Sequence, residues 1–540
     1  MENAETPYRA FSRSAAAHPA RAFVMAPPAA GLSWAPKGYS MTYAEAEHRI
    51  TGLRCKFLDA GYGRGSRIGL LLENRPTFLL HWLALNSIGA SIVPLNGEMR
   101  PEELQHQIRN SRAETVIALE SYTSLLGQSV PDEIPVFGED TALSRAVSLR
   151  APGLGLPEDE AALLFTSGSS GKPKACILSN LYFSMVADWY VTLPGVAKIE
   201  CPVAVTPLPF YHMNALACTA GGMITVGGTI VTLDRFHPSS WWRIIAECRA
   251  TLVHALGVIP AILLQLPEGP DDLSHVANAI FSPGVDAIHK IAFESRFGLP
   301  VLEGWSMTET GGAAVTDTVG LVGTLGPRCI GRPRVAVDWR IVDDHGREVA
   351  VGEVGELVVR AQGADLRRGF FSGYLGDPVA TEEAWKGGWF HTGDIIRADA
   401  DGLFYFIDRN KSIVRRSGEN ISALEVEAAL VADPAVRSAA VTAVADAMRG
   451  EEVFAFVVPA GLADTDGFAT DLLSRLAKRL TYHKLPGFLA LVDSLPFGGT
   501  QKLLRGQIKA DAEAALMEGK AIDLRREKAA QRTKAGSRAP

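Results

Sequence analysis

The sequence predicts an α/β fold in which helices cover a parallel sheet. Between residues 42 and 304, short apolar strands alternate with amphipathic helices, which is the pattern of βαβ units. From residue 335, short strands separated by Gly and Asp turns predict a small antiparallel barrel or sheet. Past residue 409, a few helices and strands predict one further small mixed domain.

The parallel region consists of helices and strands of ordinary length. Residues 42–60 carry apolar side chains at helical spacing and predict its first helix. Further helices are predicted at residues 77–88, 101–110, 180–190, 241–247, 260–266 and 288–297. Strands are predicted at residues 67–72, 90–94, 115–118, 161–165, 203–208, 252–255, 279–281 and 301–304.

Residues 213–233 form an uncharged run that is long enough to span a bilayer. The run contains threonines and two Gly-Gly pairs, and the second pair precedes a strand-like Thr-Ile-Val-Thr-Leu. We therefore expect a buried helix, a turn and a core strand, with a membrane span as the alternative.

The last third of the chain is predicted from shorter patterns. Strands are expected at residues 338–342, 355–360, 402–408, 439–443, 453–458 and 489–492, and helices at residues 423–430 and 469–480. From residue 520 the chain carries seven Lys and Arg against two acids, with almost no aliphatic side chains. We expect a solvated, frayed end there, and a tail for an anionic partner is the alternative.

Charge and cysteine content limit the class of partner. The 53 Lys and Arg against 60 Asp and Glu give a net charge of −7, which offers no argument for nucleic acid. The six cysteines are scattered without a Cys-x-x-Cys pair, so we expect free thiols in a reducing compartment and no metal–thiolate site. Residues 1–12 lack the apolar core of a secretory signal. We expect a cytoplasmic protein; the sequence leaves its oligomeric state open, with a homodimer as one option.

Residues 163–174 predict a phosphate-binding loop. An apolar strand runs directly into six residues of Thr, Ser and Gly, which Lys172 and Lys174 follow. Glycines let successive backbone N–H groups point at one anion, while hydroxyl groups and lysines add donors and positive charge. An ordinary surface loop is the alternative. The loop is not a Walker A motif, because Pro173 stands where that motif needs Ser or Thr.

Later stretches carry side chains that suit a nucleotide. Trp305 follows a strand end and could stack on a purine, Thr308 could donate to a phosphate, and Glu309 is a hard oxygen ligand for nucleotide-bound Mg²⁺. Asp394 lies on a Gly turn and suits ribose hydroxyls. A core tryptophan and a plain β-turn are the alternatives. Lys502 lies on a Gly-rich loop near the C-terminus and by itself resembles any exposed lysine.

Together and in this order, the motifs resemble those of the adenylate-forming superfamily of acyl-CoA synthetases, luciferases and peptide-synthetase adenylation domains. The resemblance covers residues 8–505 or so, and its Gly418-Glu419-Asn420 run is typical of the CoA-ligase branch. The matching stretches are residues 166–174, 305–309, 388–394, 408–427 and the loop around Lys502. Residues 210–220, 408–420 and 452–458 look most like crotonobetaine/carnitine-type CoA ligases.

The resemblance implies a division of the chain. Residues 1–408 would form a large N-terminal domain of two parallel-sheet α/β subdomains and a small barrel-like subdomain. A hinge at residues 409–411, centred on Lys411, would lead into a mobile α+β lid domain over residues 412–515. We expect residues 516–540 to be a disordered basic tail.

The resemblance also implies a reaction in two halves, with ATP, Mg²⁺ and CoA. A carboxylate would attack the α-phosphorus of ATP, giving an acyl-adenylate and pyrophosphate, and CoA would then give acyl-CoA and AMP. Lys502 would meet the carboxylate and the α-phosphate. The other implied catalytic residues are Thr166, Glu309 and His212, with Glu309 as the metal ligand.

The remaining implied site residues fall into three groups. Those for ATP and AMP are Thr166, Ser167, Gly168, Ser169, Ser170, Gly171, Lys174, Gly284, Trp305, Ser306, Thr308, Asp394, Ile407 and Arg409. Those for CoA are Arg415, Arg416, Ser417, Gly418, Glu419 and Asn420. Those of the acyl pocket are His212, Met213, Asn214, Val258 and Ser282. For His212, a satisfied core histidine is the alternative.

The sequence departs from the family pattern at a few positions and leaves the substrate open. Trp305 replaces the usual Tyr, Ser306 the usual Gly, and Gln501 the Gly before Lys502; none of these changes removes a charged catalytic group. Pro283 lacks the N–H that a backbone contact to adenine would need. An enzyme that loads a carrier protein and a non-catalytic nucleotide-binding protein remain as alternatives, and no particular carboxylic acid is indicated.

Overall fold

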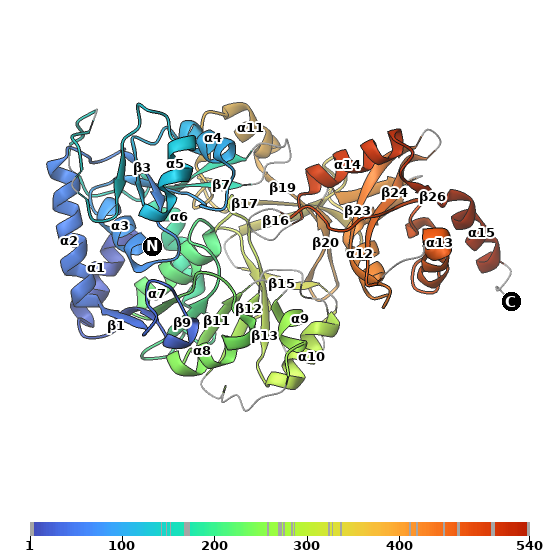
Figure 1. Ribbon diagram of the computed structural model, residues 1–540, viewed down its shortest axis with the longest axis horizontal. Helices are drawn as coiled ribbons and strands as arrows, with labels where there is room; N and C mark the ends of the chain where they lie inside the picture. Colours follow the sequence, from blue (N-terminus) through green and yellow to red (C-terminus); the bar gives the residue numbers. More distant parts are fainter. Residues whose placement is uncertain are drawn as a thin grey trace.

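The computed structural model describes residues 5–536 of the chain with internal gaps. The gaps are residues 142, 147, 152, 167–172, 256–258, 268–272, 274–275, 282–284, 286, 322–324, 327, 335–336, 410–411, 417–418, 447–448, 462–464 and 498–502. For residues 280, 281, 287, 415, 419, 420, 465, 466 and 532–536 only the backbone is described. The described chain folds into a large N-terminal lobe and a smaller C-terminal lobe (Figure 1).

The largest sheet of the N-terminal lobe has thirteen strands. Its order is β16 (Val337–Val342), β17 (Val354–Ala361), β19 (Phe390–Ala398), β20 (Phe404–Arg409), β15 (Cys329–Pro333), β14 (Thr316–Asp317), β13 (Val301–Trp305), β12 (Asn278–Phe281), β11 (Leu252–Ala255), β9 (Val203–Thr206), β10 (Thr229–Thr232), β1 (Ala22–Ala26) and β2 (Tyr39–Thr42). The strands from β13 to β1 pair in parallel, as predicted. The expected antiparallel unit is present, but it continues the same sheet through β14 and is not a separate barrel.

The second sheet has seven strands. Its order is β18 (Gly373–Tyr374), β8 (Lys174–Ser179), β7 (Glu160–Thr166), β4 (Ser91–Pro94), β3 (Arg67–Leu71), β5 (Thr115–Ala118) and β6 (Val136–Gly138). It is parallel from β7 to β6, whereas β8 and β18 add antiparallel pairs at one edge. This edge carries both ends of the predicted phosphate loop, because β7 ends at Thr166 and β8 begins at Lys174.

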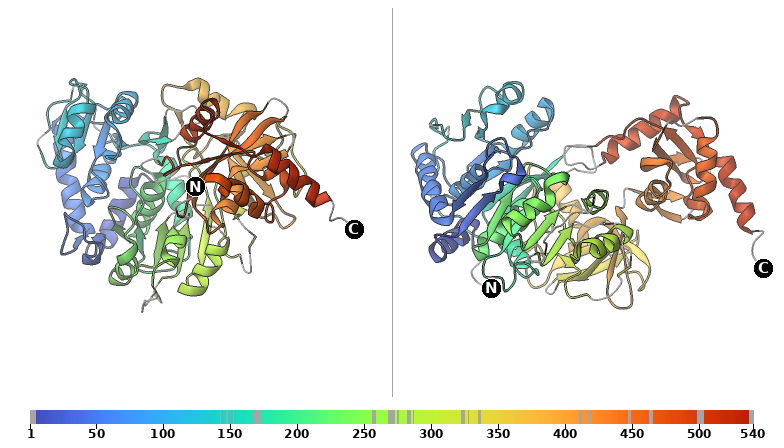
Figure 2. Two further views of the ribbon diagram at one scale, coloured as in Figure 1. Left: turned by 45° about the vertical axis from the view of Figure 1, so that its right-hand side comes forward. Right: turned by 60° about the horizontal axis from the view of Figure 1, so that its bottom comes forward.

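Helices cover the faces of these sheets (Figures 1 and 2). They are α1 (Pro7–Ala17), α2 (Tyr43–Asp59), α3 (Pro76–Asn86), α4 (Pro101–Ser111), α5 (Thr123–Ser129), α6 (Asn180–Tyr190), α7 (Gly221–Val226), α8 (Trp241–Cys248), α9 (Ile259–Leu264), α10 (Ala287–Phe297) and α11 (Pro378–Ala384). Short helical turns are η1 (Pro28–Ala30), η2 (Glu120–Tyr122), η4 (Pro238–Ser240) and η5 (Lys386–Gly388).

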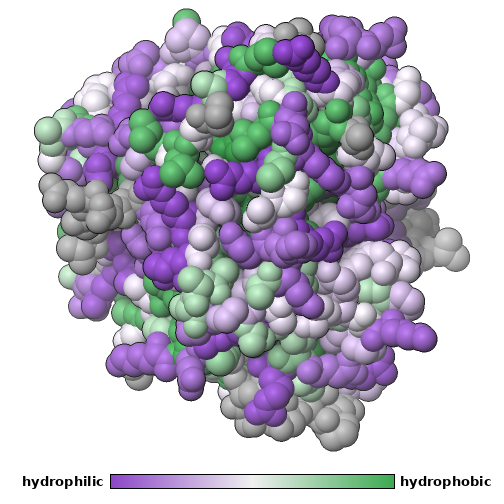
Figure 3. Space-filling view, turned by 90° about the vertical axis from the view of Figure 1, so that its left-hand side faces the viewer, coloured by the Kyte–Doolittle hydropathy of each residue, from purple (hydrophilic) through white to green (hydrophobic). Residues whose placement is uncertain are grey.

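Local sequence explains why α2 and α3 differ. The hydroxyl of Thr42 caps α2 while Glu45 reaches back to the Thr42 N–H, and this reciprocal pair satisfies two free backbone donors. Helix α3 begins with Pro76 and is buried along nearly its whole length, which suits its almost wholly apolar sequence. On the outer face of this part of the molecule hydrophilic side chains predominate, with smaller hydrophobic groups between them (Figure 3).

The uncharged run at 213–233 has the predicted buried helix, turn and strand. A π-helical turn, η3 (Asn214–Ala220), continues into α7, Gly227 ends that helix in the left-handed region at φ 64°, and β10 follows in the core. Among the described residues, no helix is both long and apolar enough to cross a membrane.

The C-terminal lobe packs helices on a six-stranded sheet and stands beside the N-terminal lobe in Figure 1 and in the right-hand view of Figure 2. Its strands are β21 (Ile413–Arg416), β22 (Glu419–Ser422), β23 (Val436–Asp446), β24 (Gly450–Pro459), β25 (Phe488–Leu491) and β26 (Ile522–Asp523). Its helices are α12 (Ala423–Val431), α13 (Thr465–Leu476), α14 (Arg505–Met517) and α15 (Arg525–Gly536), with a short turn η7 (Tyr482–Lys484). Arg505 of α14 donates to Glu427 of α12, with 2.9 Å between its Nη2 and Oε2.

The expectation that residues 516–540 form a disordered tail is wrong for the described residues. Strand β26 pairs with β25, and α15 follows it. Leu524 is buried in the lobe's core, and Lys528 is buried as well. The composition resembles that of a solvated end because few positions of this segment face inward, yet those few anchor it to the sheet.

Candidate nucleotide-binding site

Several of the predicted motifs meet in the N-terminal lobe. Thr166 ends β7, Glu309 follows the end of β13, and Asp394 and Arg409 face each other as register partners on β19 and β20. Strand ends are where open α/β sheets place ligands, because the backbone leaves the sheet there and side chains can turn toward a common space.

Glu309 is a buried carboxylate at the centre of one group of contacts. Its Oε1 accepts a hydrogen bond from the Tyr374 hydroxyl at 3.0 Å and a long one from the Thr166 hydroxyl at 3.5 Å. Its backbone carbonyl accepts from the N–H of Phe371 at 2.9 Å. The segment before β18 is thereby tied to the turn after β13, and the carboxylate lies beside the start of the Gly/Ser loop.

Tyr374 joins this carboxylate to Lys174. Strand β18 sets Tyr374 opposite Cys176 of β8, so its hydroxyl reaches Glu309 while Lys174 Nζ lies 4.7 Å from the centre of its ring. A cation over a ring face is attracted by the ring quadrupole. Burial and then the Glu309 charge raise the pKa of Tyr374, so it stays a neutral donor. A lone Tyr after Gly373 carries no sequence signal for this position.

Trp305, Asp394 and Arg409 form a second group. The indole N–H of Trp305 donates to Asp394 Oδ2 at 2.7 Å, and Arg409 Nε lies 2.6 Å from Asp394 Oδ1. Burial raises the pKa of Asp394 to about 6, against the opposing effects of Arg409 and Trp305. Trp305 is 2% exposed, so its ring offers no open face in this arrangement. The structure shows that Trp305 orients Asp394 through a hydrogen bond, and the stacking of Trp305 on a purine stays a prediction.

The expected Gly turn at Asp394 is not present, because this residue lies within β19, where the pairing with β17 is irregular. Glu356 of β17 fixes this stretch. Its carboxylate accepts from Gly393 N at 3.0 Å and lies 3.0 Å from His391 Nδ1. Gly393 adopts φ 67°, which favours glycine, and the Thr392 hydroxyl donates to the Leu357 carbonyl at 2.7 Å. The Asp394 backbone N–H also donates to Thr392 Oγ1 at 3.0 Å. This stretch of β19 is therefore tied to β17 just before the carboxylate.

The other predicted residues of the Trp305 motif lie in a tight turn. Ser306 is partly buried, and its hydroxyl donates to the Gly311 carbonyl at 2.8 Å. Thr308 is partly buried as well. The Thr310 hydroxyl accepts from the Met307 N–H at 3.0 Å. These contacts fix the path of the chain between Trp305 and Glu309, and so the separation of the two groups.

The junction between the lobes is anchored by Asp408. This buried carboxylate accepts from the Ser422 hydroxyl at 2.8 Å, the Leu424 N–H at 3.1 Å and the Arg409 N–H at 2.7 Å. Ile407, predicted to touch the nucleotide, is partly buried; its carbonyl accepts from Arg328 at 2.9 Å and from Ser422 at 3.2 Å. The start of α12 is thus bonded to the last strand of the N-terminal lobe.

The predicted acyl-pocket segment is held by a residue that the sequence did not single out. Asn74 donates to the carbonyls of Leu208 and Leu233 at 2.8 Å each and accepts from the N–H of Phe210 at 2.9 Å. His212 and Met213 follow within this fixed segment. Nothing in a lone Asn after β3 signals this role.

His212 is partly buried, and its ring lies 4.7 Å from that of Tyr211 in an edge arrangement. Met213 is buried and accepts the Tyr182 hydroxyl at 3.5 Å, and Asn214 begins the π-helical turn η3. π-Helical turns are frequent at functional sites. The structure places these three predicted residues in sequence along one segment.

Arg416 differs from its expectation as a CoA-facing residue. Its side chain is only 3% exposed, and its Nε lies 2.8 Å from both carboxylate oxygens of Glu452. A guanidinium that is buried and paired inside the lobe does not present its charge to a ligand. The other predicted residues of this segment with described backbone, Arg415, Glu419 and Asn420, lie on β21 and β22.

The remaining predicted site residues lie outside the described residues. They are Ser167, Gly168, Ser169, Ser170, Gly171, Val258, Ser282, Gly284, Lys411, Ser417, Gly418 and Lys502.

The residues around Glu309 suit Mg²⁺ that arrives with a nucleotide. A carboxylate and a hydroxyl, from Glu309 and Thr166, are hard oxygen donors, and Mg²⁺ bound with phosphates usually takes one or two protein ligands. Within the ranges that the structure describes, no three His, Cys, Asp or Glu side chains gather in a way that could hold a metal without further ligands.

Comparison with known families decides the class. The model of the family described as AMP-binding enzyme matches residues 11–375, more than half of the chain, and the AMP-binding enzyme C-terminal domain matches residues 425–502. The chain belongs to the AMP-binding enzyme family. The resemblance to adenylate-forming enzymes is thereby confirmed, and the phosphate loop, the Trp305 motif and Tyr374 all lie inside the first matched region of this AMP-binding enzyme.

Relatives of this AMP-binding enzyme cover almost all of it. It is 28% identical over 500 residues to a crotonobetaine/carnitine–CoA ligase of Citrobacter koseri, an alignment that covers 87% of this chain and 93% of that protein. Its fold resembles ATP-bound MatB from Rhodopseudomonas palustris, with a TM-score of 0.79, 23% identity, and coverage of 95% and 99% of the two chains. It also resembles the anthranilate CoA ligase AuaEII in complex with anthranoyl-AMP, with a TM-score of 0.81, 20% identity, and coverage of 95% and 98%. These likenesses confirm the predicted α/β fold.

Proposed function

We propose that this AMP-binding enzyme is an AMP-forming acid–CoA ligase. One observation carries the proposal: the segment 305–309 contributes a residue to each of two groups of contacts. Glu309 contacts Thr166 and Tyr374. Trp305 bonds Asp394, which pairs with Arg409. The first group suits Mg²⁺ that arrives with the phosphates, and the second suits a ribose. The curated relatives that match over most of their length are named as crotonobetaine/carnitine–CoA ligases, which supports CoA as the second substrate.

In the first half-reaction, a carboxylate oxygen attacks the α-phosphorus of ATP, and the bond to the β-phosphate oxygen breaks to release pyrophosphate. The loop 166–174 holds the β- and γ-phosphates, and Asp394 and Arg409 hold the ribose. Lys502 stabilises the negative charge that gathers between the carboxylate and the α-phosphate. Glu309 and Thr166 would hold Mg²⁺, which would supply positive charge against that of the phosphates.

In the second half-reaction, the CoA thiolate attacks the carbonyl carbon of the adenylate, and the bond to the phosphate oxygen breaks to release AMP. No protein nucleophile is needed. All six cysteines are free thiols, and burial raises the pKa of Cys176, the one beside Thr166, well above its usual range. A buried, neutral thiol at that position is not a candidate nucleophile.

We propose the domain division stated above with one change, that the lid continues to α15. Residues 1–408 form the N-terminal domain, residues 409–411 the hinge with Lys411 at its centre, and residues 412–536 the lid. The contacts of Asp408 with Ser422 and Leu424 support a pivot at this junction, because they hold the lid's first helix close to it. Rotation about the hinge would exchange Lys502 for the segment 415–420 at the reaction centre.

For the carboxylic acid substrate we propose a class and no single compound. The acyl pocket would include His212, Met213, Asn214, Val258 and Ser282. Short, medium, cyclic and carnitine-like acids are candidates, and the names of the curated relatives favour a carnitine-like acid. A cytoplasmic location is supported by the six free thiols and by the use of ATP, and a homodimer is a further proposal that light scattering tests.

One assay separates the proposal from its alternatives. The purified protein is incubated with ATP, Mg²⁺ and a panel of carboxylic acids, with and without CoA, and AMP and acyl-CoA are measured by mass. AMP and acyl-CoA in equal amounts, with one acid and only with CoA, are expected. Release of pyrophosphate with one acid but no acyl-CoA when CoA is supplied favours loading of a carrier protein, and neither pyrophosphate nor AMP with any acid contradicts the proposal.

A further inference from the structure

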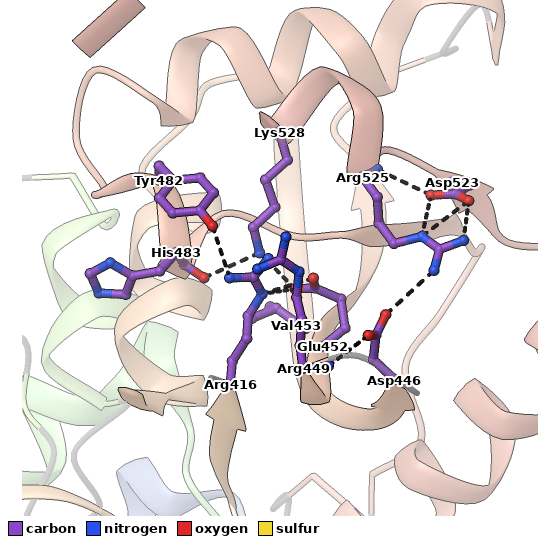
Figure 4. A network of polar contacts seen from close by, with 10 residues as sticks. All are labelled: Arg416, Asp446, Arg449, Glu452, Val453, Tyr482, His483, Asp523, Arg525 and Lys528. Carbon is purple, nitrogen blue, oxygen red and sulfur yellow. Dashed lines mark hydrogen bonds and ion pairs between the residues drawn. The ribbon is translucent and has the colours of Figure 1, made fainter. Parts of the chain in front are cut away.

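A buried group of one carboxylate and two cations lies inside the C-terminal lobe (Figure 4). Glu452 is 0% exposed, Arg416 3% and Lys528 1%. Arg416 Nε lies 2.8 Å from both oxygens of Glu452, and Lys528 Nζ lies 2.6 Å from Oε1. We call these three residues the Glu452 cluster.

Neighbouring groups complete the hydrogen bonds of the cluster. Lys528 also donates to the His483 carbonyl at 3.1 Å, and Arg416 Nη1 donates to the Tyr482 hydroxyl at 3.4 Å (Figure 4). The guanidinium carbon of Arg416 lies 5.4 Å from the centre of the Tyr482 ring. Charged groups this deep are tolerated only when they are paired and hydrogen-bonded.

The cluster joins three distant parts of the chain. Arg416 ends β21, Glu452 lies near the start of β24, and Lys528 belongs to α15. Gly487 allows the close approach of Glu452, because a Cβ there would lie 2.4 Å from Glu452 Cγ. The Leu524 N–H donates to the Gly487 carbonyl at 2.9 Å, so the chain entering α15 is bonded at the same place.

The charges of the cluster do not balance. Glu452 and Arg416 already form a neutral pair, and Lys528 adds a second buried cation. Burial lowers the pKa of Lys528 to about 8, although the Glu452 charge acts in the opposite direction. An apolar side chain at residue 528 would avoid this desolvation cost. The second cation is therefore poorly explained as a device for stability alone.

Arg416 directly precedes residues 417–420, the segment that the proposed function places beside CoA. We propose that Lys528 is a positioning residue for the second half-reaction, acting through Glu452 to fix Arg416, from which the segment 417–420 continues. The proposal rests on the proposed function. Helix α15 lies beyond residue 502, where the match to the C-terminal family domain ends, so the family pattern does not supply Lys528.

The test compares Lys528→Met with Arg526→Met, which removes an exposed cation from the same helix. Each half-reaction is measured separately, with the acid that the wild-type protein uses. Pyrophosphate exchange reports adenylation, and the single-turnover rate of acyl-CoA formation at saturating CoA reports the second half. For Lys528→Met we expect thioester formation to fall on the order of tenfold to a hundredfold, because small displacements from reactive geometry have large rate effects. Adenylation and both rates of Arg526→Met should stay within about twofold of wild type.

Adenylation by the same variant also reports folding, since an unfolded lid cannot bring Lys502 to the site. If Lys528→Met loses both activities, Lys528→Arg tests whether the loss comes from misfolding of the lid, because this variant keeps a cation beside Glu452. Adenylation restored together with most of the thioester rate supports the proposal. Equal losses of both half-reactions in both variants, or wild-type thioester formation by Lys528→Met, overturn it. A wild-type protein that forms no thioester with any acid contradicts the proposed function instead.

Discussion

Tyr374 contacts two charged residues, Glu309 and Lys174. Its hydroxyl donates to Glu309, and its ring lies under Lys174. Tyr374 makes both contacts as a neutral side chain, so it can hold an anion and a cation at a set separation before a nucleotide arrives. In the proposed reaction this preorganisation matters, because the Glu309 carboxylate would have to stay aimed at a metal that the phosphates bring.

Tyr374→Phe is expected to weaken the use of Mg²⁺-ATP. A hydrogen bond to a charged group contributes about 1.5–3 kcal/mol, so kcat/KM for ATP should fall about tenfold or more, with a higher Mg²⁺ requirement. Pyrophosphate exchange at varied Mg²⁺ and calorimetric binding of Mg²⁺-ATP measure the effect. Tyr122→Phe is the matched control, because Tyr122 makes a similar 2.9 Å bond to Glu73 elsewhere on the lobe. An equal change in kcat/KM for ATP in the two variants would contradict the proposed role of Tyr374.

Asp394 predicts a pH dependence near 6. Its pKa in the folded protein is about 6, raised from 3.8 by burial, so the carboxylate that pairs with Arg409 predominates above that pH. The value of log kcat/KM for ATP should rise with a slope near 1 up to pH about 6 and then level. In the unfolded chain this carboxylate ionises at a lower pH than in the folded protein. As pH rises from about 4 to 6, the group therefore lowers the free energy of unfolding.

The Asp394 prediction is checked by the pH profile of Asp394→Asn, which should lack this step whatever its residual rate. A wild-type profile that is flat between pH 5 and 7 would rule the assignment out. Glu45, an exposed acid whose pKa is lowered by its hydrogen bonds to Thr42, has its charge change well below this range.

Sequence patterns locate the chemistry of this site better than they describe its contacts. The Trp305–Glu309 and His391–Asp394 motifs are visible locally, because the first follows an apolar strand and the second places a carboxylate after a glycine. That Trp305 holds Asp394 depends on how two strands far apart in sequence meet, which no local pattern contains. Tyr374 and Asn74 were missed for the same reason, since each acts on a partner more than sixty residues away.

At the scale of elements, buried apolar strands were predictable and the C-terminal helix was not. Strands β5, β11 and β10 are fully buried four-residue runs without a Lys, Arg, Asp or Glu, and their β-branched and apolar side chains indicate this directly. Helix α15 has a mostly polar sequence, and its attachment depends on Leu524 and Lys528. A lysine that is buried against a carboxylate looks in sequence like any solvated lysine.

The Glu452 cluster predicts unequal stability effects. Glu452→Gln leaves two buried cations without a counter-charge, so the lid should lose about 3–5 kcal/mol in its free energy of unfolding. Lys528→Met leaves a balanced pair and should cost far less. The double variant should recover part of the loss. Denaturant unfolding of the four proteins as a double-mutant cycle measures the coupling, and additive losses would mean that the two residues do not interact.

At the scale of the molecule, the two lobes are joined by a junction that the proposed reaction uses as a pivot. Asp408 bonds the end of β20 to the beginning of α12. The division into lobes was visible in the sequence as a change of pattern after residue 409. The relative placement of the two lobes was not, because the proposed exchange of faces would give the chain more than one arrangement, which local sequence does not encode.

Lys411→Pro is expected to block thioester formation while sparing adenylation. Proline fixes φ near −65° and removes an N–H, so it should prevent the rotation without touching either set of reacting groups. Lys411→Ala is the control, since it removes the side chain but keeps the backbone free, and it should retain both half-reactions. Rapid-quench measurement of adenylate and acyl-CoA in one experiment separates the steps; matched losses of both would contradict a hinge at this residue.

The central claim is that the two half-reactions use different faces of one lid, with Lys502 serving only the first. The most direct measurement compares two rates of Lys502→Ala, pyrophosphate exchange and conversion of supplied acyl-adenylate plus CoA to acyl-CoA. Exchange should fall on the order of 10²- to 10³-fold, as when one oxyanion donor is lost, while conversion of the supplied adenylate stays within about twofold of wild type. Unchanged exchange, or an equal loss of both rates, would contradict the account.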